Sequence, residues 1–330
     1  GHRTLLGGNS WTALSTVVSD EGADATHAVV EVSAFQLWEP HRMRPSVSIL
    51  TNIAPDHLDH YAADEDYVAA KLPIHRNLGA DTAAVLHAGD ARLAAAGRGL
   101  RESGVPTLGY SIDPPGADSG WHGRAWVDGR SLEVEDAAGS LEVPIECLRV
   151  PGSHNRKNAL AALLGVRRLL GSESASLTAE TAQRGLGGFT GLPHRLEFVR
   201  ELDTVRYFDD SKATNVHAAV AGIRSMDRPL VAIVGGVDKR LDLGPFIDAL
   251  ADHARAVVVI GELRPRFLEE SRGRIRVVRE ADDLEGAVSL ARAESWPGDA
   301  VVLSPGCSSF DMFRSFEHRG RAFADAVDAL

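Results

Sequence analysis

The stretch SVSILTNIAPDHLDHYAADEDYVAAKLPIHRN, Ser46 to Asn77, decides the fold. Its first part, Val47 to Ile53, is apolar and rich in β-branched residues, which is typical of a buried strand in a parallel sheet. Pro55 ends that strand, and the polar run Asp56-His57-Leu58-Asp59-His60 follows it. Because open α/β sheets bind ligands at the carboxyl ends of their strands, the pattern predicts an α/β fold with a functional site here; the alternative is that these are only solvated loop residues.

A helix is predicted to begin at Asp64 and to carry an inward-facing lysine. One face of that helix holds Tyr67, Ala70, Lys71 and Ile74. Burial lowers the pKa of an amine and makes the amine nucleophilic toward carbon dioxide or a carbonyl group. Lys71 is therefore either a surface lysine whose stem lies along the apolar face, or a lysine that is used in chemistry.

Composition bounds the class of protein. With 330 residues, 44% of them hydrophobic, the chain is long enough for two domains. Its net charge of −11 is not gathered into one tail, which argues against nucleic acid and against an anionic membrane surface as partners. No apolar run approaches the ~20 residues of a membrane span, and the first residues have no signal-peptide pattern. The chain does not begin with Met, so we expect that it starts partway through a gene product.

The two cysteines, Cys147 and Cys307, have no spacing that suggests a disulfide framework or a zinc site, so we expect a cytoplasmic protein. Lysine is scarce as well. Four of the 35 basic residues are lysines, namely Lys71, Lys157, Lys212 and Lys239. Arginine cannot replace a titratable amine, so these lysines are candidates for chemistry; the alternative is a codon bias that left four by chance.

Two polar residues stand out near the amino terminus. Leu5 to Ser10 reads as a strand end and a glycine turn, in which Asn9 can present its amide to a ligand. His27 to Val32 reads as a buried strand, and it carries Glu31 near its end. A buried carboxylate needs a metal ion or a lysine as partner, whereas on an edge strand Glu31 would face water; the pattern leaves both open.

The middle of the chain is predicted to add small antiparallel strands to the first sheet. Short β-like runs separated by turns lie at Ala83–Leu86, Thr107–Tyr110, Gly123–Val127, Ser131–Val134 and Leu141–Pro144. The polar segment Pro151 to Asn158 then leads into a helix predicted over Ala159 to Leu170. That segment is either an anion or nucleotide site at a helix amino terminus, or only a capped helix.

A boundary is predicted near Phe189 to Pro193, where Gly and Pro interrupt a helical segment. Four strands separated by helices follow, at Val205–Phe208, Leu230–Val234, Ala256–Ile260 and Ala300–Leu303, and they predict a second α/β domain with a parallel sheet. Lys212, Lys239 and Ser308-Ser309 come after three of these strands. We therefore expect them along one carboxyl edge, where such sheets bind ligands.

Seven motifs occur in an order that is specific as a set. They are EVSAFQL, TNIAPDHLDHY, HNRKNALAAL, GLPHRLEFV (Gly191 to Val199), DDSKATN (Asp209 to Asn215), GGVDK (Gly235 to Lys239) and LSPGCSSFDMFRSFEHRG (Leu303 to Gly320). Over almost the whole chain this arrangement resembles the Mur ligases of bacterial cell-wall synthesis, and above all the members that use D-glutamate.

The resemblance implies a fold and an activity. Residues 1–189 would form part of a P-loop-type ATPase domain, a parallel sheet with small antiparallel strands, and residues 190–330 a Rossmann-like α/β domain that binds the amino acid. The implied reaction is ATP-dependent: the carboxylate of UDP-N-acetylmuramoyl-L-alanine becomes an acyl phosphate, and the amine of D-glutamate attacks it, which forms an amide of the peptidoglycan precursor.

The resemblance also implies roles for single residues. Glu31 would hold one Mg²⁺, and His57 with a carbamoylated Lys71 the second; His57 and Lys71 would be catalytic. ATP would meet Asn155 and Asn158 at the adenine, and Arg195 and Asp210 at the sugar and phosphates. Asn9 would contact the muramoyl substrate, and D-glutamate would be held by Lys212, Thr214, Lys239, Ser309 and Phe316. A carbamate turns an ammonium into an anionic oxygen ligand, which a hard cation prefers.

One departure from the family pattern shapes the expected activity. Family members carry a glycine-rich phosphate loop that ends in Gly-Lys-Ser or Gly-Lys-Thr, and no Gly-Lys pair occurs in these 330 residues. We therefore expect that this chain alone does not ligate. Two alternatives stay open: a non-catalytic remnant that binds nucleotide and glutamate, and a ligase like folylpolyglutamate synthase. The sequence predicts no oligomeric state.

Overall fold

The computed structural model describes residues 2–9, 12–38, 42–53, 64–116, 120–150 and 152–330. His57 and the rest of the run after Pro55 lie outside these ranges. The chain forms two compact units, Gly1–Gly109 with Ala117–Gly123, and Tyr110–Gly116 with Arg124–Leu330. Among the helices of the described ranges, none combines the length and the apolar character that crossing a membrane requires.

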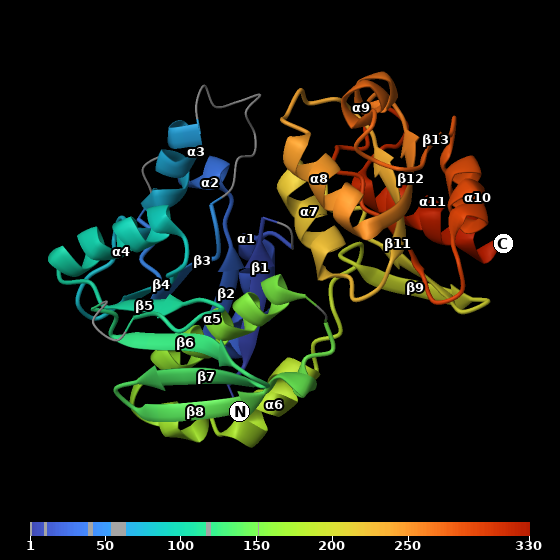
Figure 1. Cartoon of the computed structure of the whole chain (residues 1–330). Helices are drawn as coiled ribbons and strands as arrows, with labels where there is room; N and C mark the ends of the chain where they lie inside the picture. Colours follow the sequence, from blue (N-terminus) through green and yellow to red (C-terminus); the bar gives the residue numbers. More distant parts are fainter. Residues whose placement is uncertain (1, 10–11, 39–41, 54–63, 117–119, 151) are drawn as a thin grey trace. The chain divides into compact units, whose positions relative to one another are not determined.

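Parallel strand pairs and short helices make up the first unit (Figure 1). Its elements are β1 (Thr4–Gly8), α1 (Leu14–Glu21), β2 (His27–Glu31), α2 (Ala34–Leu37), β3 (Val47–Leu50), α3 (Asp64–Lys71), β4 (Ala83–His87), α4 (Ala91–Glu102) and β5 (Thr107–Tyr110). β1 pairs with β2, and β3 with β4, both in parallel. The predicted helix from Asp64 is confirmed, and it ends at Lys71, where a 3-10 turn over Leu72–His75 takes over.

The middle of this unit differs from the sequence-based expectation at two points. The run Ala83–Leu86 is not a small antiparallel strand: as part of β4 it pairs in parallel with β3, because a helical crossover connects the two. Helix α4 was not expected either. It begins after Asp90, whose carboxylate accepts hydrogen bonds from the backbone N–H groups of Arg92 and Leu93, which is the usual way a helix amino terminus is satisfied.

Strand β2 was predicted to be buried, and it is exposed. Val29 keeps 54% of its surface exposed and Val30 36%. In the part of the chain that the structure describes, β2 pairs with β1 alone, in a two-stranded sheet. An apolar, β-branched sequence indicates a tendency of the strand to be buried, but it does not predict which segment packs against the strand.

The second unit begins with an antiparallel portion. It contains β6 (Gly123–Asp128), β7 (Ser131–Asp136), β8 (Gly139–Pro144), α5 (Ser153–Leu170) and α6 (Ala179–Gly187), and β7 and β8 pair antiparallel as predicted. Helix α5 starts six residues before the predicted Ala159, directly after Gly152, which has φ 96°. Arg167 near its end donates to both carboxylate oxygens of Asp136 and to the carbonyl of Gly139, which fixes the helix to the β7–β8 turn.

The rest of the second unit is a six-stranded sheet covered by helices (Figure 1). The strands β9 (Glu197–Leu202), β10 (Val205–Asp209), β11 (Leu230–Gly235), β12 (Ala254–Ile260), β13 (Val278–Glu280) and β14 (Ala300–Leu303) lie in the order β13-β12-β11-β14-β10-β9. The four predicted strands are confirmed as parallel neighbours. β9, antiparallel to β10, and the short β13 were not predicted.

Alternation along β11 shows why this sheet is buried on both faces. Leu230, Ala232 and Val234 pack with residues of α7 (Val216–Ser225), α8 (Gly244–His253) and α9 (Arg264–Ser271). Val231 and Ile233 pack on the other side with α10 (Leu284–Glu294) and α11 (Phe316–Asp328). A strand covered on both faces needs the continuous apolar sequence seen here, and its ligands must then bind at its carboxyl end.

Candidate functional site

Three adjacent strands of the second unit, β10, β14 and β11, end at one edge of the sheet. Their last residues lead into the segments Asp209-Asp210-Ser211-Lys212, Ser304-Pro305-Gly306-Cys307 and Gly235-Gly236-Val237. Val237 forms an isolated antiparallel bridge with Ser308, which ties the segment after β11 to the one after β14. The predicted meeting of three strand ends along one carboxyl edge is confirmed.

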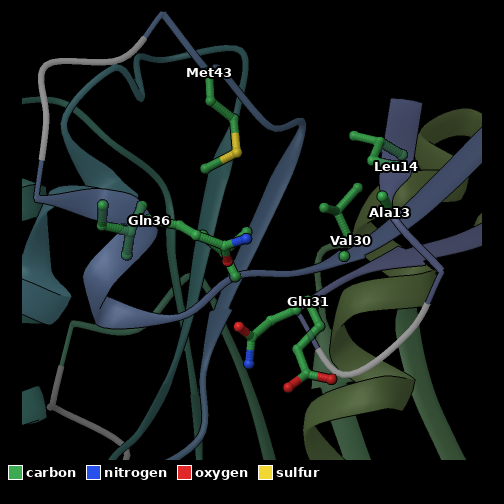
Figure 2. A pocket seen from close by; sticks show the side chains of 10 residues that line it. Ala13, Leu14, Val30, Glu31, Gln36 and Met43 are labelled. Carbon is green, nitrogen blue, oxygen red and sulfur yellow. The ribbon is translucent and has the colours of Figure 1, made fainter. Parts of the chain in front are cut away.

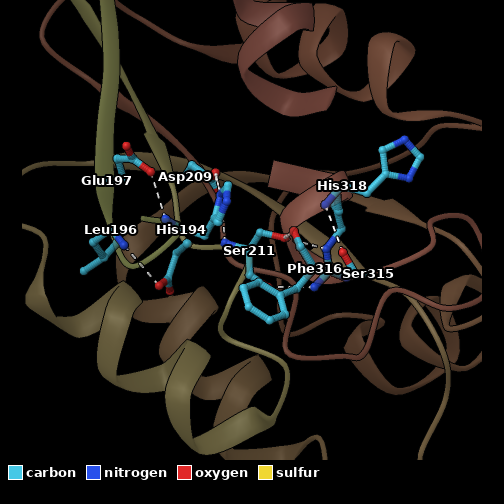
Figure 3. Close-up of polar contacts among 10 residues, drawn as sticks. His194, Leu196, Glu197, Asp209, Ser211, Ser315, Phe316 and His318 are labelled. Carbon is cyan, nitrogen blue, oxygen red and sulfur yellow. Dashed lines mark hydrogen bonds and ion pairs between the residues drawn. The ribbon is translucent and has the colours of Figure 1, made fainter. Parts of the chain in front are cut away.

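A histidine and two carboxylates form a hydrogen-bonded group at the end of β10 (Figure 3). Nδ1 of His194 lies 2.6 Å from Oδ2 of Asp209, and the backbone N–H of His194 donates to Glu197 at 2.8 Å. Asp209 also accepts a hydrogen bond from the backbone N–H of Ser211 at 2.8 Å. Burial raises the pKa of the Asp209 carboxyl, and the hydrogen bonds from His194 and Ser211 oppose that rise.

His194, Glu197 and Asp209 also satisfy a distance test for a metal site, since one ligand atom of each lies within 4.8 Å of the others. The ring and the backbone of His194 already engage both carboxylates, so the group is held together by its own hydrogen bonds. We therefore treat it as a structural link between β9, β10 and the preceding turn.

Asp210 is buried next to this group and has a strongly perturbed acidity. Its carboxylate accepts hydrogen bonds from the hydroxyl of Ser304 at 2.9 Å and from the backbone N–H of Leu196 at 3.2 Å. Burial raises the pKa of Asp210 to about 7, although both hydrogen bonds act to lower it. A carboxyl group that titrates near neutral pH is a common feature of functional sites.

The residues that the resemblance gives to the amino acid come together at the same edge. Nζ of Lys212 lies 5.2 Å from the centre of the Phe316 ring, and Nζ of Lys239 donates to the carbonyl of Thr214 at 3.4 Å. Ser309 is 2% exposed, and its carbonyl accepts from the N–H groups of Met312 and Phe313. These elements therefore hold two ammonium groups, a buried hydroxyl and an aromatic ring around one strand edge.

Lys239 forms no ion pair with the aspartate that precedes it in the sequence. Asp238 instead pairs with Arg266 at 2.8 Å. Within the described ranges, no carboxylate lies within the 4.0 Å of an ion pair from Nζ of Lys239. Its charge is therefore available to an anionic ligand.

Three of the residues assigned to ATP lie on other elements of the second unit, whereas Asp210 directly follows β10. Asn155 and Asn158 belong to the first turns of α5, where a spacing of three residues puts them on one helix face. Asn155 is partly buried and Asn158 is exposed, as is Arg195 in the turn before β9. Their nucleotide contacts stay a prediction.

Glu31 and Asn9 line a pocket in the first unit (Figure 2). The pocket has a volume of about 490 Å³, and Gln36 and Met43 also line it. The backbone N–H of Asn9 donates to the carbonyl of Glu31 at 2.9 Å. Gly8 makes this approach possible: its φ is +121°, and a Cβ there would stand 2.1 Å from the carbonyl oxygen of Glu31.

Lys71 closes α3 with its ammonium over an aromatic ring. Nζ lies 4.7 Å from the centre of the Tyr67 ring, and Tyr67 and Ala70 are buried on the face that the sequence predicted. Lys71 itself is partly buried, and its use in chemistry stays a prediction. Its predicted partner His57 lies outside the described residues, and no geometry joins the two.

Sequence reasoning missed two residues of the second unit, the partly buried His194 and the fully buried Arg319. His194 and Arg319 stand inside the quoted motifs GLPHRLEFV and FRSFEHRG, yet neither was assigned a role. Arginine carried no signal in a chain that uses it almost everywhere. The one usable signal was Gly320, a glycine in the first turns of a helix, where it is disfavoured unless a neighbour needs the space. A Cβ at Gly320 would lie 2.2 Å from Nδ1 of His194 and 2.4 Å from Oδ2 of Asp209.

Two family models match the chain. The Mur ligase middle domain matches residues 7–166, and the Mur ligase glutamate ligase domain matches residues 194–307. UDP-N-acetylmuramoylalanine–D-glutamate ligase from Symbiobacterium thermophilum is 37% identical over 335 residues, and the enzyme of that name from Salinibacter ruber is 38% identical over 339. Each of these comparisons covers 100% of this chain and 70% of the relative.

Solved structures share the fold at lower identity. The chain matches a folylpolyglutamate synthase from Mycobacterium tuberculosis with a TM-score of 0.68 and 21% identity, over 94% of this chain and 70% of that one. It matches MurF from Acinetobacter baumannii with a TM-score of 0.69 and 17% identity, over 99% of this chain and 71% of that one.

Proposed function

The chain belongs to the Mur ligase family of ATP-dependent ligases, and on that premise we propose that it adds D-glutamate to UDP-N-acetylmuramoyl-L-alanine in peptidoglycan precursor synthesis. The relatives that are 34–38% identical carry the name of that ligase, which favours D-glutamate as the amino acid. The observation that carries the proposal is the strand edge of the second unit: Lys212 lies beside Phe316 there, Lys239 contacts Thr214, and Ser309 is buried in the segment after β14.

The chemistry of glutamate matches that edge. Its two carboxylates need cations, which Lys212 and Lys239 supply, and the buried Ser309 hydroxyl and Thr214 add hydroxyl donors. The Phe316 ring would cover the side-chain methylenes. The amine must stay free of anions and unprotonated, because its lone pair attacks the acyl phosphate: the C–N bond forms, phosphate leaves with the C–O electrons, and the nitrogen loses a proton.

The phosphoryl side of the reaction would use the other assigned residues. Asn155 and Asn158 would bind the adenine, Arg195 and Asp210 the sugar and phosphates, and Asn9 the muramoyl substrate. Asp210, buried against Ser304 and Leu196, offers one carboxyl group in a fixed orientation. A fixed group costs no reorganisation when charge develops in the transition state.

The residues of the first unit fit a hard cation. Glu31 lines an open pocket with a carboxylate, and carboxylate oxygens are what Mg²⁺ prefers. Lys71 becomes an oxygen ligand only as a carbamate, and with His57 it would hold a second ion. Bound there, Mg²⁺ supplies neutralisation of the negative charge on the transferring phosphoryl group.

Substrate-dependent phosphate release tests the proposal in the protein as the cell makes it. With ATP, Mg²⁺, UDP-N-acetylmuramoyl-L-alanine and D-glutamate we expect turnover in the range of about 1–100 s⁻¹, lost when either carbon substrate is omitted. Equal turnover with L-glutamate or D-aspartate would refute the amino-acid assignment, and turnover with a folate and L-glutamate would favour the folylpolyglutamate alternative. That these 330 residues alone do not ligate stays a prediction, which the same assay tests.

A further inference from the structure

Arg319 is the largest fully buried side chain of the described residues, and it belongs to the strand-end site. It lies in the first turns of α11, three residues after Phe316, and is 1% exposed. Its guanidinium donates from Nε to the hydroxyl of Ser211 at 2.9 Å, and from Nη2 to the carbonyls of Ser211 at 2.8 Å and Cys307 at 3.1 Å. A longer contact of 3.5 Å runs from Nη1 to the carbonyl of Gly235.

These acceptors belong to three different segments. Ser211 follows β10 and precedes Lys212, Cys307 follows β14 and stands two residues before Ser309, and Gly235 is the last residue of β11. One planar group therefore contacts all three segments from which the amino-acid pocket is built. The hydroxyl of Ser211 in turn donates to the carbonyl of Phe316 at 2.8 Å, so the network also includes the start of α11.

The charge of Arg319 has no carboxylate to neutralise it. Across the described ranges, no aspartate or glutamate oxygen lies within ion-pair distance of this guanidinium, and all its partners are carbonyls or a hydroxyl. Burial lowers the pKa of Arg319 to about 10, while more distant charges at Asp311 and Asp209 act against that change. Burying a charge in this way is costly, and the cost is offset only if every donor direction is used.

Only an arginine fits this arrangement. The guanidinium presents donors in several fixed directions in one plane, whereas a lysine ammonium is a compact point charge that cannot reach acceptors on opposite sides. The neighbouring backbone leaves no slack: Gly236 has φ +138°, and a Cβ there would lie 2.3 Å from the carbonyl oxygen of Ser308 and 3.3 Å from Nη1 of Arg319.

We propose that Arg319 is a positioning residue of the amino-acid pocket, which fixes the spacing among Lys212, Lys239 and Ser309 by holding the segments after β10, β11 and β14 at one point. The naming of D-glutamate as the ligand rests on the proposed function, and the geometric claim does not. The competing interpretation is a core arginine that stabilises the unit and leaves the pocket unaffected.

The test compares variants of Arg319 with a buried arginine elsewhere in the second unit. We expect Arg319→Lys and Arg319→Met to raise the KM for D-glutamate by about tenfold or more and to change the KM for ATP by less than about twofold. Arg167→Met is the control, since Arg167 is also buried but contacts the β7–β8 turn. It should lower the melting temperature without changing the ratio of the two KM values.

Chemical rescue separates positioning from stability. In Arg319→Ala we expect added guanidinium at non-denaturing concentration to lower the KM for D-glutamate again, and methylammonium at the same ionic strength to leave it unchanged, because only the planar ion can contact several carbonyls. Wild-type KM values in Arg319→Lys, or equal increases of both KM values in every Arg319 variant, would overturn the proposal.

Hydrogen exchange tests the positioning role of Arg319 independently of the proposed function. If wild-type protein shows no turnover with D-glutamate, the function fails, and the geometric claim is read from backbone amides instead. Arg319→Lys should then speed exchange in segments 211–215, 236–240 and 304–309 and leave the β7–β8 turn protected. Unchanged exchange in those three segments would refute the positioning role.

Discussion

Around Glu31 in the first unit the assigned side chains are exposed or half-buried, whereas at the strand ends of the second unit Asp209, Asp210 and Ser309 are almost fully buried. The second region holds its residues through side-chain hydrogen bonds that cross from one segment to another. A preorganised region of this kind discriminates ligands by shape, whereas a more open region relies on its charge and on the ions or ligands that it binds. Mutations in the two regions should therefore affect different measured quantities.

The largest effect is expected from Lys71→Ala in the first region. If Lys71 acts as a carbamate that ligates a metal ion, its removal should lower kcat by about 10³-fold, the upper range for loss of one charge-stabilising group. Short carboxylates added to the assay should restore part of the rate, since they can supply the missing oxygen ligand. Wild-type activity, or rescue by amines in place of carboxylates, would contradict the carbamate.

In the second region, Asp210→Asn should alter stability in a pH-dependent way. The folded-state pKa of Asp210 is raised from 3.8 to about 7, so the wild-type carboxyl stabilises the fold below pH 4 and that contribution is lost as pH rises to 7. Between pH 5 and pH 8 the free energy of unfolding of the wild type should fall by about 2–3 kcal/mol, and that of the asparagine variant should not. Denaturant unfolding at both pH values measures this difference. Asp299→Asn, which removes the negative charge that pairs with the guanidinium of Arg255, should lower the free energy of unfolding at both pH values and serves as the control.

His75 gives the first unit the opposite pH dependence. This histidine is 6% exposed, lies 2.8 Å through Nδ1 from the hydroxyl of Ser48, and has no partner for Nε2 among the described residues. Burial lowers the pKa of His75 to about 4, so the neutral ring contributes its full stabilisation above pH 6.5. The free energy of unfolding of the wild type should therefore fall by about 2 kcal/mol between pH 8 and pH 5. His75→Asn should flatten that loss. An unchanged acid profile would mean that another group controls it.

A further effect concerns the amino-acid pocket itself. Ser309→Ala and Lys239→Ala should raise the KM for D-glutamate about 10- to 100-fold and leave the KM for ATP nearly unchanged, because their contacts belong to the amino acid alone. Ser271→Ala, a buried serine in α9, is the matched control and should leave both constants unchanged. Normal glutamate affinity in both pocket variants would show that the assignment is wrong even within the right family.

The two regions also differ in how far the sequence could predict them. Continuous apolar runs such as Leu230–Val234 identified the parallel strands, because a strand buried on both faces has no polar positions. Lys212, Lys239 and Ser309 followed from the strand ends. The partners of those residues could not be predicted: His194 meets Asp209 across 15 positions, and Arg319 meets Ser211 across 108. Such contacts depend on the packing of segments, which periodicity does not report.

The same limit explains the errors in the first unit. The run His27–Val32 has the composition of a covered strand, but composition cannot say which segment packs against such a strand. Helix α4 was missed because its glycines and arginines resemble a turn-rich segment, whereas its apolar face, with Leu93 buried, is evident only once the helix is formed.

The close packing at Gly320 has a genetic consequence. A single added methyl group at this position would press on the contact between His194 and Asp209 without altering either residue. A codon change to alanine there should therefore behave as a conditional allele, whose protein folds at low temperature and unfolds at high temperature. Such an allele would allow the protein to be switched off in living cells by temperature alone.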